Sequence, residues 1–412
     1  MATARVATTI GPTTARRMAL MPPHLGTAGE DRRPRCMCRC SAPKSATKGS
    51  RLIGVAPARG LSDPLGGGRS RAHYLVVDLG TGLCTQLGIQ LPIFCAGMGA
   101  AAGPDLVAAV SEAGGLGVLG MAGAPPEVIR SRLAQVRRMT GRPVGVNLII
   151  DGVETEEDRE RIRNEIIAAA QGGAAVVVLF WGDASPYVDI AHENGLMLLL
   201  QVGSVDEARA AVTAGVDAVI AQGVEAGGHV RGTTSVWELV PAVVEAITPA
   251  PVVASGGIGD GRGLARALAL GAQAVSFGTR FLATNEAYAH PGYKQRIVDS
   301  SAEDTVYSTL FDGGWPDAPH RVLRTRLVNS WEAAGRPPSG SRPGEGDIVG
   351  MVARSNGATE PWRRYAVGVA GPDFGGDLDD APLWSGTSCE QVHDIKPAAQ
   401  VIADLVREAT PS

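Results

Sequence analysis

Short apolar runs alternate with amphipathic segments between residues 91 and 277. Each run is apolar throughout, as expected for parallel strands that are covered on both faces. The segments between them repeat apolar positions every three or four residues, which indicates helices. The predicted strands are Leu91–Ala96, Leu116–Met121, Val144–Ile150, Ala174–Phe180, Leu196–Val202, Ala218–Ala221, Pro251–Ala254 and Ala274–Phe277. The predicted helices between them are Pro104–Ala113, Pro125–Met139, Thr155–Ala170, Pro186–Glu193, Val205–Thr213, Ser235–Ile247 and Arg262–Leu270.

An eighth helix, Ile395–Glu408, follows the last strand only after more than a hundred residues. Eight strand–helix units predict an α/β fold of the closed (β/α)8 type, a TIM barrel, and an open doubly wound sheet is the alternative. We assign residues 73–282 and 395–412 to the barrel. Residues 283–394, with a predicted helix near Pro291–Val298, are interpreted as a lid or small subdomain inserted before the last helix, over the ligand-binding face.

Local signals support these helices. Thr155 and Asp158 resemble a capping box, and Ser204 is placed to cap the helix that follows it. Glycines that follow a predicted helix favour a left-handed helix end, and they are Gly115, Gly195, Gly215 and Gly271.

Charge is distributed unevenly along the 412 residues. The net charge is −4, which gives no reason to expect a nucleic acid partner. Residues 1–72 carry 13 Lys and Arg against 3 Asp and Glu and have no sustained periodicity, so we expect a disordered basic leader. An organelle transit peptide and an over-long start assignment are further interpretations.

The six cysteines form no disulfide framework, which favours a reducing compartment, and we expect a cytoplasmic protein. Cys36, Cys38 and Cys40 lack the spacing of common zinc sites, so no metal is expected. No apolar run is near the about 20 residues of a membrane span, and no membrane partner is expected. A homo-oligomer is compatible with the sequence.

The stretch from Gln222 to His229 is the centre of the predicted site. It follows a predicted strand, at the strand end where parallel barrels bind ligands. Gly227 and Gly228 let the backbone turn sharply, and His229 exchanges a proton near neutral pH. We expect Glu225 to anchor this loop by accepting N–H bonds. A structural or capping role is the alternative for His229.

Two glycine-rich turns follow the seventh and eighth strands, Gly256-Gly257 and Phe277-Gly278. In barrels the loops after these strands commonly hold a phosphate with bare backbone N–H groups. Ser276 and Thr279 add hydroxyl donors. The alternative is a pair of tight turns with no ligand.

A phosphate site beside a ring-sized cavity suggests FMN. Ala96-Gly97-Met98, after the first strand, would let the flavin ring lie against backbone, and Asn147 on the third strand would present an amide to it. A buried core role is the alternative for Asn147. Cys95 is expected to be buried and His192 to be a surface or packing residue. Trp315 and His320, in the insertion, are candidates to face the substrate.

These motifs resemble the nitronate monooxygenase family, formerly called 2-nitropropane dioxygenases. The resemblance spans residues 91–280, and its matching pieces are Leu91-Pro92-Ile93 with Met98, Gly114 to Gly117, Gly145-Val146-Asn147, Gln222 to His229, Ser255 to Ile258 and Gly278-Thr279. It implies a TIM-like barrel with a smaller second domain that binds FMN without metal. The implied reaction is oxidation of alkyl nitronates by dioxygen to a carbonyl compound and nitrite. The family's first-strand motif usually reads Ala-Pro-Met, whereas this chain has Ala96-Gly97-Met98.

The resemblance also implies site roles. His229 is expected to be catalytic, as a base toward nitroalkanes or a hydrogen-bonding group toward nitronates. The expected FMN contacts are Ala96, Gly97, Met98, Asn147, Gln222, Gly227, Gly228, Gly256, Gly257, Ser276, Phe277, Gly278 and Thr279. The alternatives are an FMN-dependent enoyl-acyl carrier protein reductase, an NADH:quinone reductase and a non-catalytic flavin-binding protein.

Overall fold

The computed structural model describes residues 79–313, 315, 318–353 and 357–410. The predicted leader, residues 1–72, lies outside the described residues. Among the described residues, no helix is long and apolar enough to cross a membrane.

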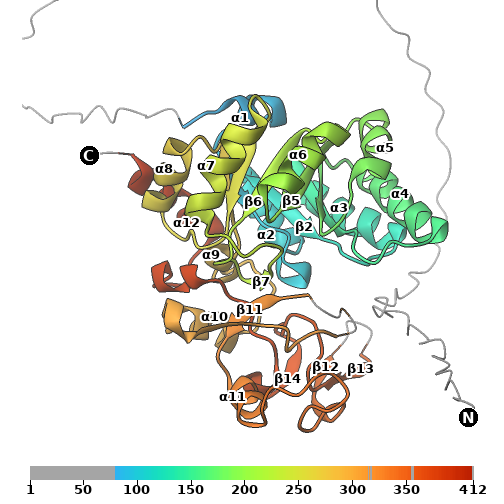
Figure 1. The fold of residues 1–412 in the computed structure, drawn as a ribbon, viewed down its shortest axis with the longest axis vertical. Helices are drawn as coiled ribbons and strands as arrows, with labels where there is room; N and C mark the ends of the chain where they lie inside the picture. Colours follow the sequence, from blue (N-terminus) through green and yellow to red (C-terminus); the bar gives the residue numbers. More distant parts are fainter. Residues whose placement is uncertain (1–78, 314, 316–317, 354–356, 411–412) are drawn as a thin grey trace, which may run out of the picture. The chain divides into compact units, whose positions relative to one another are not determined.

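Eight parallel strands close into a barrel in the order β1-β2-β3-β4-β5-β6-β8-β9, which confirms the predicted fold class (Figure 1). β1 closes the ring by pairing with β9, with Phe94 opposite Ser276. The barrel strands are β1 (Ile93–Cys95), β2 (Leu116–Gly120), β3 (Val144–Ile149), β4 (Val176–Phe180), β5 (Met197–Val202), β6 (Ala218–Gln222), β8 (Val252–Ser255) and β9 (Ala274–Phe277).

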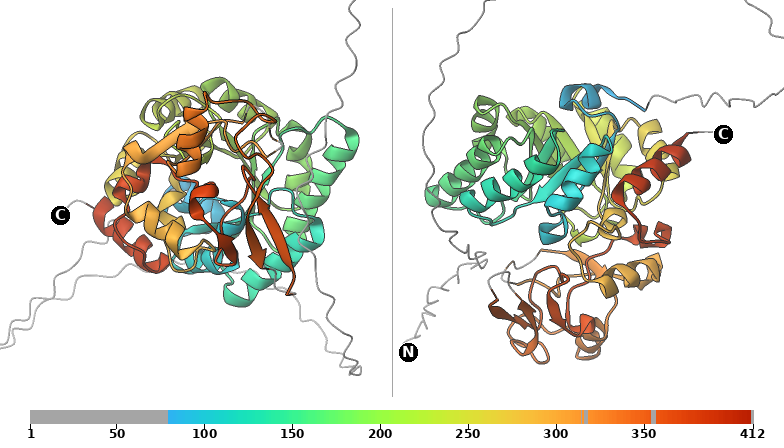
Figure 2. Two further views of the ribbon diagram at one scale, coloured as in Figure 1. Left: turned by 90° about the horizontal axis from the view of Figure 1, so that it is seen from below. Right: turned by 180° about the vertical axis from the view of Figure 1, so that it is seen from behind.

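Helices surround this barrel, as the turned views of Figure 2 show. The late helix α12 packs against α8 and α2, so it fills the position of the eighth barrel helix. The outer helices are α2 (Pro104–Glu112), α3 (Pro126–Met139), α4 (Glu156–Gln171), α5 (Val188–Glu193), α6 (Val205–Ala214), α7 (Val236–Ile247), α8 (Gly261–Ala269) and α12 (Ala398–Ala409).

Two apolar layers stabilise the barrel. Alternate strand residues such as Phe94, Leu116 and Ile220 fill its interior, and the others pack against the helices. The short helix α1 (Gly82–Leu87) contributes Leu83 and Leu87 to the interior layer. Helix α1 was not expected from the sequence, because six residues are too few to show a helical period.

The predicted helix ends are mostly correct. Thr155 and Asp158 form the capping box of α4, and Ser204 accepts the bond that caps α6. The prediction for Gly115 is wrong, because the left-handed residue after α2 is its neighbour Gly114 (φ 95°). Gly115 instead lies so close to the preceding strand that a Cβ there would be 2.5 Å from the Ile93 carbonyl oxygen.

Among its described residues, the inserted segment between α9 (Thr279–Leu282) and α12 contains two α-helices. Its strands form two small antiparallel sheets, one of which also includes β7 from the loop after β6. The helix predicted near Pro291–Val298 is present as α10 (Pro291–Val298), and α11 (Arg326–Ala333) follows. One sheet has the order β10-β11-β7, and the other has the order β13-β12-β14. Their strands are β7 (Gly228–His229), β10 (Thr305–Ser308), β11 (His320–Leu323), β12 (Ile348–Ala353), β13 (Thr359–Arg363) and β14 (Phe374–Gly376).

Candidate active site

The carboxyl ends of the barrel strands carry the candidate residues. Asn147 lies on β3, Gln222 ends β6 and Ser276 lies on β9, while the Gly256-Gly257 turn follows β8. The closed parallel order places these strand ends on one face of the barrel. The predicted convergence on the ligand-binding face therefore follows directly from the topology.

Gln222 holds the loop that carries His229. Its side-chain nitrogen donates to the His229 carbonyl at 2.9 Å, and its side-chain oxygen accepts from the Arg231 N–H at 3.0 Å. The residue is only 4% exposed, so these bonds form in a protected environment. The Gln222 amide thus fixes the backbone on both sides of the histidine. Direct contact of Gln222 with a flavin stays a prediction.

The loop is fastened at two further points. The Glu225 carboxylate accepts from the Ser235 hydroxyl at 2.5 Å and from the Val236 N–H at 3.0 Å, so the anchoring expected of Glu225 is confirmed. From the insertion, the Arg321 guanidinium donates to the Val224 carbonyl at 2.9 Å. The barrel and the insertion therefore share the task of positioning this loop.

His229 itself belongs to a strand that the insertion supplies with a partner. It lies in β7, opposite His320 of β11 in an antiparallel pair. The residue is partly exposed, yet its Nε2 atom is buried and has no hydrogen-bond partner among the residues that the structure describes. A buried polar atom without a partner is costly, and such atoms in native structures commonly face a ligand. The geometry leaves this nitrogen available to a ligand, and the catalytic role of His229 stays a prediction.

The electrostatics keep this imidazole neutral. Burial, and to a smaller extent the nearby His320, lower the pKa of His229 from its ordinary value of 6.5 to about 3. At neutral pH the ring is therefore uncharged and can donate or accept one hydrogen bond at Nε2, according to its tautomer. It is also a weak base.

His320 lies against His229 but both of its nitrogens are used within the insertion. Nδ1 bonds the Ala318 carbonyl at 3.1 Å, and Nε2 accepts from the Phe311 N–H at 3.1 Å. Burial lowers the pKa of His320 to about 4. His320 is fully buried and is 5.7 Å from His229 between ring centroids. It therefore supports the histidine and has no free nitrogen for a substrate.

Tryptophans surround the His229 ring. The ring of Trp315 is 4.3 Å from it, that of Trp384 is 5.5 Å away and that of Trp181 is 6.3 Å away, between centroids. The sequence suggested Trp315 as a candidate to face the substrate. It gave no signal for Trp181 or Trp384, because neither lies in a motif.

Gly97 is explained by its contact with Asn147. A Cβ at position 97 would lie 2.4 Å from the Asn147 Cβ, well inside contact distance. The Asn147 amide in turn donates to the Val178 carbonyl at 3.1 Å. Glycine stands where the Ala-Pro-Met motif has proline, because Asn147 lies so close to the end of β1 that a side chain at position 97 would collide with it.

The two glycine-rich turns have the backbone that an anion site needs. Gly256 and Gly257 have φ of 93° and 69°, and they pack against Ala226 and Glu225. Within the described residues, the N–H groups of Gly256, Gly257 and Ile258 donate to no protein acceptor. These free donors fit a phosphate, although the packing alone also explains the glycines.

The neighbouring turn after β9 is more open. A Cβ at Gly278 would have only the Met98 sulfur within 4 Å, at 3.8 Å, so this backbone face is available to a flat group. Ser276 is buried, and the Phe277 ring packs in the core against Phe281, so Phe277 can offer only its backbone. The Thr279 hydroxyl accepts from the Gly386 N–H at 3.0 Å.

The chain between β14 and α12 packs against these glycine-rich turns. The Gln391 side chain accepts from the Gly259 N–H at 2.7 Å and donates to the Gly257 carbonyl at 3.4 Å. The Thr387 N–H donates to the Glu225 carbonyl at 3.0 Å. A Cβ at Gly227 would lie 2.3 Å from the Gly386 nitrogen, so this glycine is required by the returning chain.

Cys95 and His192 are outside this site. Cys95 is fully buried and burial raises the pKa of its thiol, as expected for an inert core residue. His192 is at the surface and bonds Asp217 at 2.9 Å. No group of three His, Cys, Asp or Glu side chains within the described residues could hold a metal ion.

A closed (β/α)8 barrel with a buried histidine nitrogen at its ligand-binding face has the architecture of a barrel enzyme. The sequence model of the nitronate monooxygenase family matches residues 81–408, and the chain belongs to this family.

Relatives and solved structures agree with that assignment. The chain is 37% identical to a (3aS,4S,5R,7aS)-5-hydroxy-7a-methyl-1-oxo-octahydro-1H-indene-4-carboxyl-CoA dehydrogenase of Rhodococcus jostii, over 68% of this chain and 73% of the relative. It is 32% identical to a probable nitronate monooxygenase of Staphylococcus saprophyticus, over 81% and 98%. Among structures, FabK from Thermotoga maritima has 33% identity and a TM-score of 0.63, over 79% of this chain and 95% of that chain. A nitroalkane oxidase from Streptomyces ansochromogenes has 27% identity and a TM-score of 0.62, over 79% and 97%.

Proposed function

We propose that the protein catalyses the FMN-dependent oxidation of alkyl nitronates by dioxygen to a carbonyl compound and nitrite. The observation that carries this proposal is the buried, unpartnered Nε2 atom of His229 at the ligand-binding face of a nitronate monooxygenase barrel. The names of a relative and of a solved structure, a probable nitronate monooxygenase and a nitroalkane oxidase, support the same substrate class.

The low pKa of His229 favours nitronates over neutral nitroalkanes as substrates. A base with a pKa of about 3 is a poor match for a weakly acidic C–H group. A nitronate has already lost that proton, so the histidine needs only to hold it. In this role Nε2–H donates to a nitronate oxygen, and Gln222 and Arg321 keep the ring in position.

The residues present fit FMN. We infer that the free N–H groups of Gly256, Gly257 and Ile258 hold the phosphate, together with the backbone of Gly278 and Thr279. The open backbone beside Met98 and Gly278 suits the flavin ring, with Ala96, Gly97 and Asn147 at its edge. Bound FMN would supply the electron transfer from the nitronate to dioxygen.

The chain's own residues then contribute orientation and shielding. His229 fixes the charged end of the substrate, and the surrounding tryptophans exclude water from it. We place the reaction in the cytoplasm, without a metal.

The proposal is tested by the purified protein. It should be yellow, release FMN on denaturation, and consume oxygen with ethyl or propyl-2-nitronate while nitrite accumulates. Bleaching of the flavin without oxygen uptake would instead favour an enoyl-acyl carrier protein reductase or an NADH:quinone reductase. Flavin binding without turnover of any of these substrates would favour a non-catalytic flavin-binding protein.

A second candidate is the dehydrogenation of a ring-bearing acyl-CoA. It is favoured by the 36% and 37% identity to two dehydrogenases whose named substrate is a bicyclic carboxyl-CoA. Spectrophotometric assay of flavin reduction by a cyclic acyl-CoA, beside a nitronate, separates the two candidates. A protein reduced by the thioester and inert to nitronates would replace the first proposal by the second.

A further inference from the structure

Three tryptophans from separate parts of the chain meet at the His229 ring, and we call Trp181, Trp315 and Trp384 the tryptophan cage. Trp181 directly follows β4, whereas the other two belong to the inserted segment. The rings of Trp315 and Trp384 are tilted by only 35° and 33° from the imidazole, and that of Trp181 is perpendicular to it. The imidazole is therefore packed against two tilted indoles and one perpendicular indole.

The backbone of Trp181 shows that this placement is specified. Its φ is 66°, in the left-handed region that bulky residues rarely adopt. Such a conformation persists only where the surroundings impose it, and it is concentrated at functional sites. The indole is held by Trp315 and Phe180, at 5.0 and 5.2 Å between ring centroids, and is 7% exposed. The left-handed backbone of Trp181 thus directs this ring toward His229.

The polar edges of the other two indoles point away from the histidine. The Trp384 N–H donates to the Gly368 carbonyl at 2.6 Å, and the Trp315 N–H donates to the Asp151 carboxylate. With these N–H groups satisfied elsewhere, the rings offer apolar faces to a ligand. Beside them, the Arg231 guanidinium lies 5.2 Å from the Trp181 ring centroid, and its charge is paired with Glu207 at 2.7 Å.

We propose that the tryptophan cage makes the enzyme selective for nitronates whose reacting carbon carries a flat apolar ring. The inference rests on the proposed function and adds its substrate class. Aromatic rings favour neighbouring aromatic rings in edge-to-face and offset arrangements, and the cage offers one perpendicular and two tilted rings around the histidine. A short alkyl group has no ring with which to make such contacts. An aryl group can contact the indoles with its own ring while His229 holds the anionic nitronate group.

Ligand binding tests the cage without any turnover. Benzoate and acetate share a planar anionic head and differ in the ring, so each is titrated into the FMN-loaded protein while tryptophan fluorescence is recorded. We expect benzoate to bind at least tenfold more tightly than acetate. The Trp181→Leu variant should lose most of this ratio, and Trp181→Phe should retain it.

The matched control is Trp237→Leu, because Trp237 lies on α7 beside Arg266 and outside the cage. It should leave the ratio unchanged. If Trp181→Leu does not fold, Trp384→Leu and Trp384→Phe provide the same comparison. Equal binding of benzoate and acetate to the wild-type protein would overturn the inference, as would a benzoate preference that survives both leucine variants.

Turnover separates this inference from the proposed function. The kcat/KM for the nitronate of phenylnitromethane should exceed that for ethyl nitronate by at least tenfold, mainly through KM. If benzoate is preferred but neither nitronate is consumed, the proposed function fails and the cage stands as a binding site for ring-bearing anions. If ethyl nitronate is used as well as the aryl compound, the cage inference fails and the proposed function stands.

Discussion

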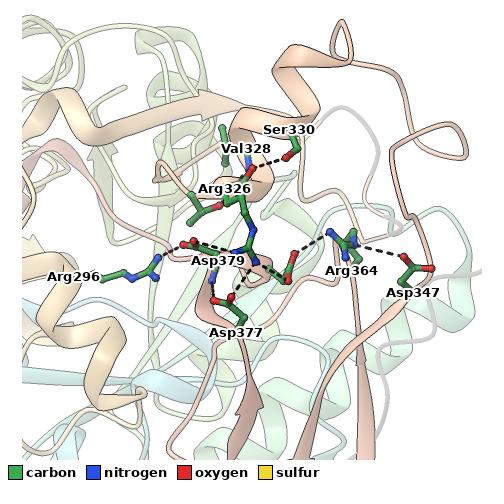
Figure 3. Close-up of polar contacts among 10 residues, drawn as sticks. Arg296, Arg326, Val328, Ser330, Asp347, Arg364, Asp377 and Asp379 are labelled. Atoms are coloured by element: carbon green, nitrogen blue, oxygen red, sulfur yellow. Dashed lines mark hydrogen bonds and ion pairs between the residues drawn. The ribbon is translucent and has the colours of Figure 1, made fainter.

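The barrel and the insertion are stabilised in different ways. Apolar side chains fill the barrel in two continuous layers, and parallel hydrogen-bonded strands enclose the inner one. The insertion has smaller, separate apolar clusters and several ion pairs. Arg326 of α11 lies beside Asp377 (Figure 3), at 3.0 Å. It also reaches Asp380 at 3.4 Å, and Arg364 reaches Asp380 at 3.0 Å.

This difference bears on the active site, because His229 depends on both regions. Its loop leaves the barrel after β6 and pairs with β11 of the insertion. A periodic apolar core tolerates many sequences, whereas a set of specific polar partners does not. We therefore expect the chemistry to be more sensitive to the insertion than its small size suggests. The following predictions test that contrast, from the largest expected effect to the smallest.

Replacing His229, whose position depends on both regions, should have the largest effect on activity. His229→Asn keeps a donor near the substrate but removes the ring nitrogen that can take a proton. With a pKa of about 3 His229 takes the proton of a neutral nitroalkane poorly, so we expect kcat/KM for that substrate to be low already and to fall by about 10²-fold, the lower end of the usual contribution of general-base catalysis. With a nitronate the loss should be nearer tenfold, a loss of about 1.4 kcal/mol in binding of the transition state.

Oxygen uptake and nitrite release measure both substrates in parallel. His192→Asn serves as the control, because His192 is a surface residue on α5. Equal losses with the nitroalkane and the nitronate would show that proton abstraction is not a special role of His229.

Truncating the barrel core should have the next largest effect, on stability. Leu116→Ala removes a fully buried side chain from the interior layer. The free energy of unfolding should fall by about 2–5 kcal/mol, the usual range for such a cavity. Urea denaturation followed by circular dichroism measures it, and added salt should not change the loss. A strongly salt-dependent loss would contradict the contrast between the two regions.

The barrel could be predicted from the sequence because its signals are local and periodic. Apolar runs bounded by turns gave all eight strands, and their order along the chain gave the closed topology once a parallel sheet was assumed. The late helix α12 was also found, since its helical spacing is clear. The short helix α1 and the left-handed conformation of Gly114 were not predicted. A six-residue helix and a single backbone conformation leave no periodic spacing in the sequence.

The candidate site could be predicted only in part, for the same reason. Strand ends gave Gln222 and His229, whose neighbourhood the structure confirms. Trp384 and Arg321 lie in a segment without periodicity. Trp384 contacts the histidine and Arg321 bonds Val224 in the same loop, across more than 90 residues of sequence. No local pattern records such a contact. The roles of the predicted flavin contacts stay predictions.

The contact between the two regions should be sensitive to pH. His229 and His320 have folded-state pKa values of about 3 and about 4, below the ordinary value of 6.5. The unfolded chain therefore binds more protons than the folded one as the pH falls below 6.5, and stability is lost on that side. Each histidine can contribute at most about 1.4 kcal/mol per pH unit, and His229, being partly exposed, contributes less.

Urea denaturation at a series of pH values between 7 and 5 measures this slope. The His320→Asn variant should show a smaller slope than the wild-type protein, whatever its stability at pH 7. An unchanged slope would show that the histidine pair does not determine the pH dependence.

The smallest effect is expected from the ion pairs of the insertion. Asp380→Asn keeps the shape of the side chain but removes the charge that Arg326 and Arg364 share. Asp380 is nearly buried, with 12% of its side chain exposed, whereas Arg326 is largely in solvent. The loss in unfolding free energy should therefore lie between that of exposed and buried pairs, at about 1–2 kcal/mol. It should shrink in salt, because the screening length falls from about 10 Å at 0.1 M to about 3 Å at 1 M.

Asp206→Asn is the matched control, since the Arg209–Asp206 pair on α6 is exposed on both sides and should contribute almost nothing. Thermal denaturation of both variants at the two ionic strengths makes the comparison, and oxygen uptake shows whether the loosened insertion still holds the β7–β11 pairing. If Asp380→Asn left the free energy of unfolding unchanged at low salt, these ion pairs would not stabilise the insertion. Its small apolar clusters would then have to account for its stability.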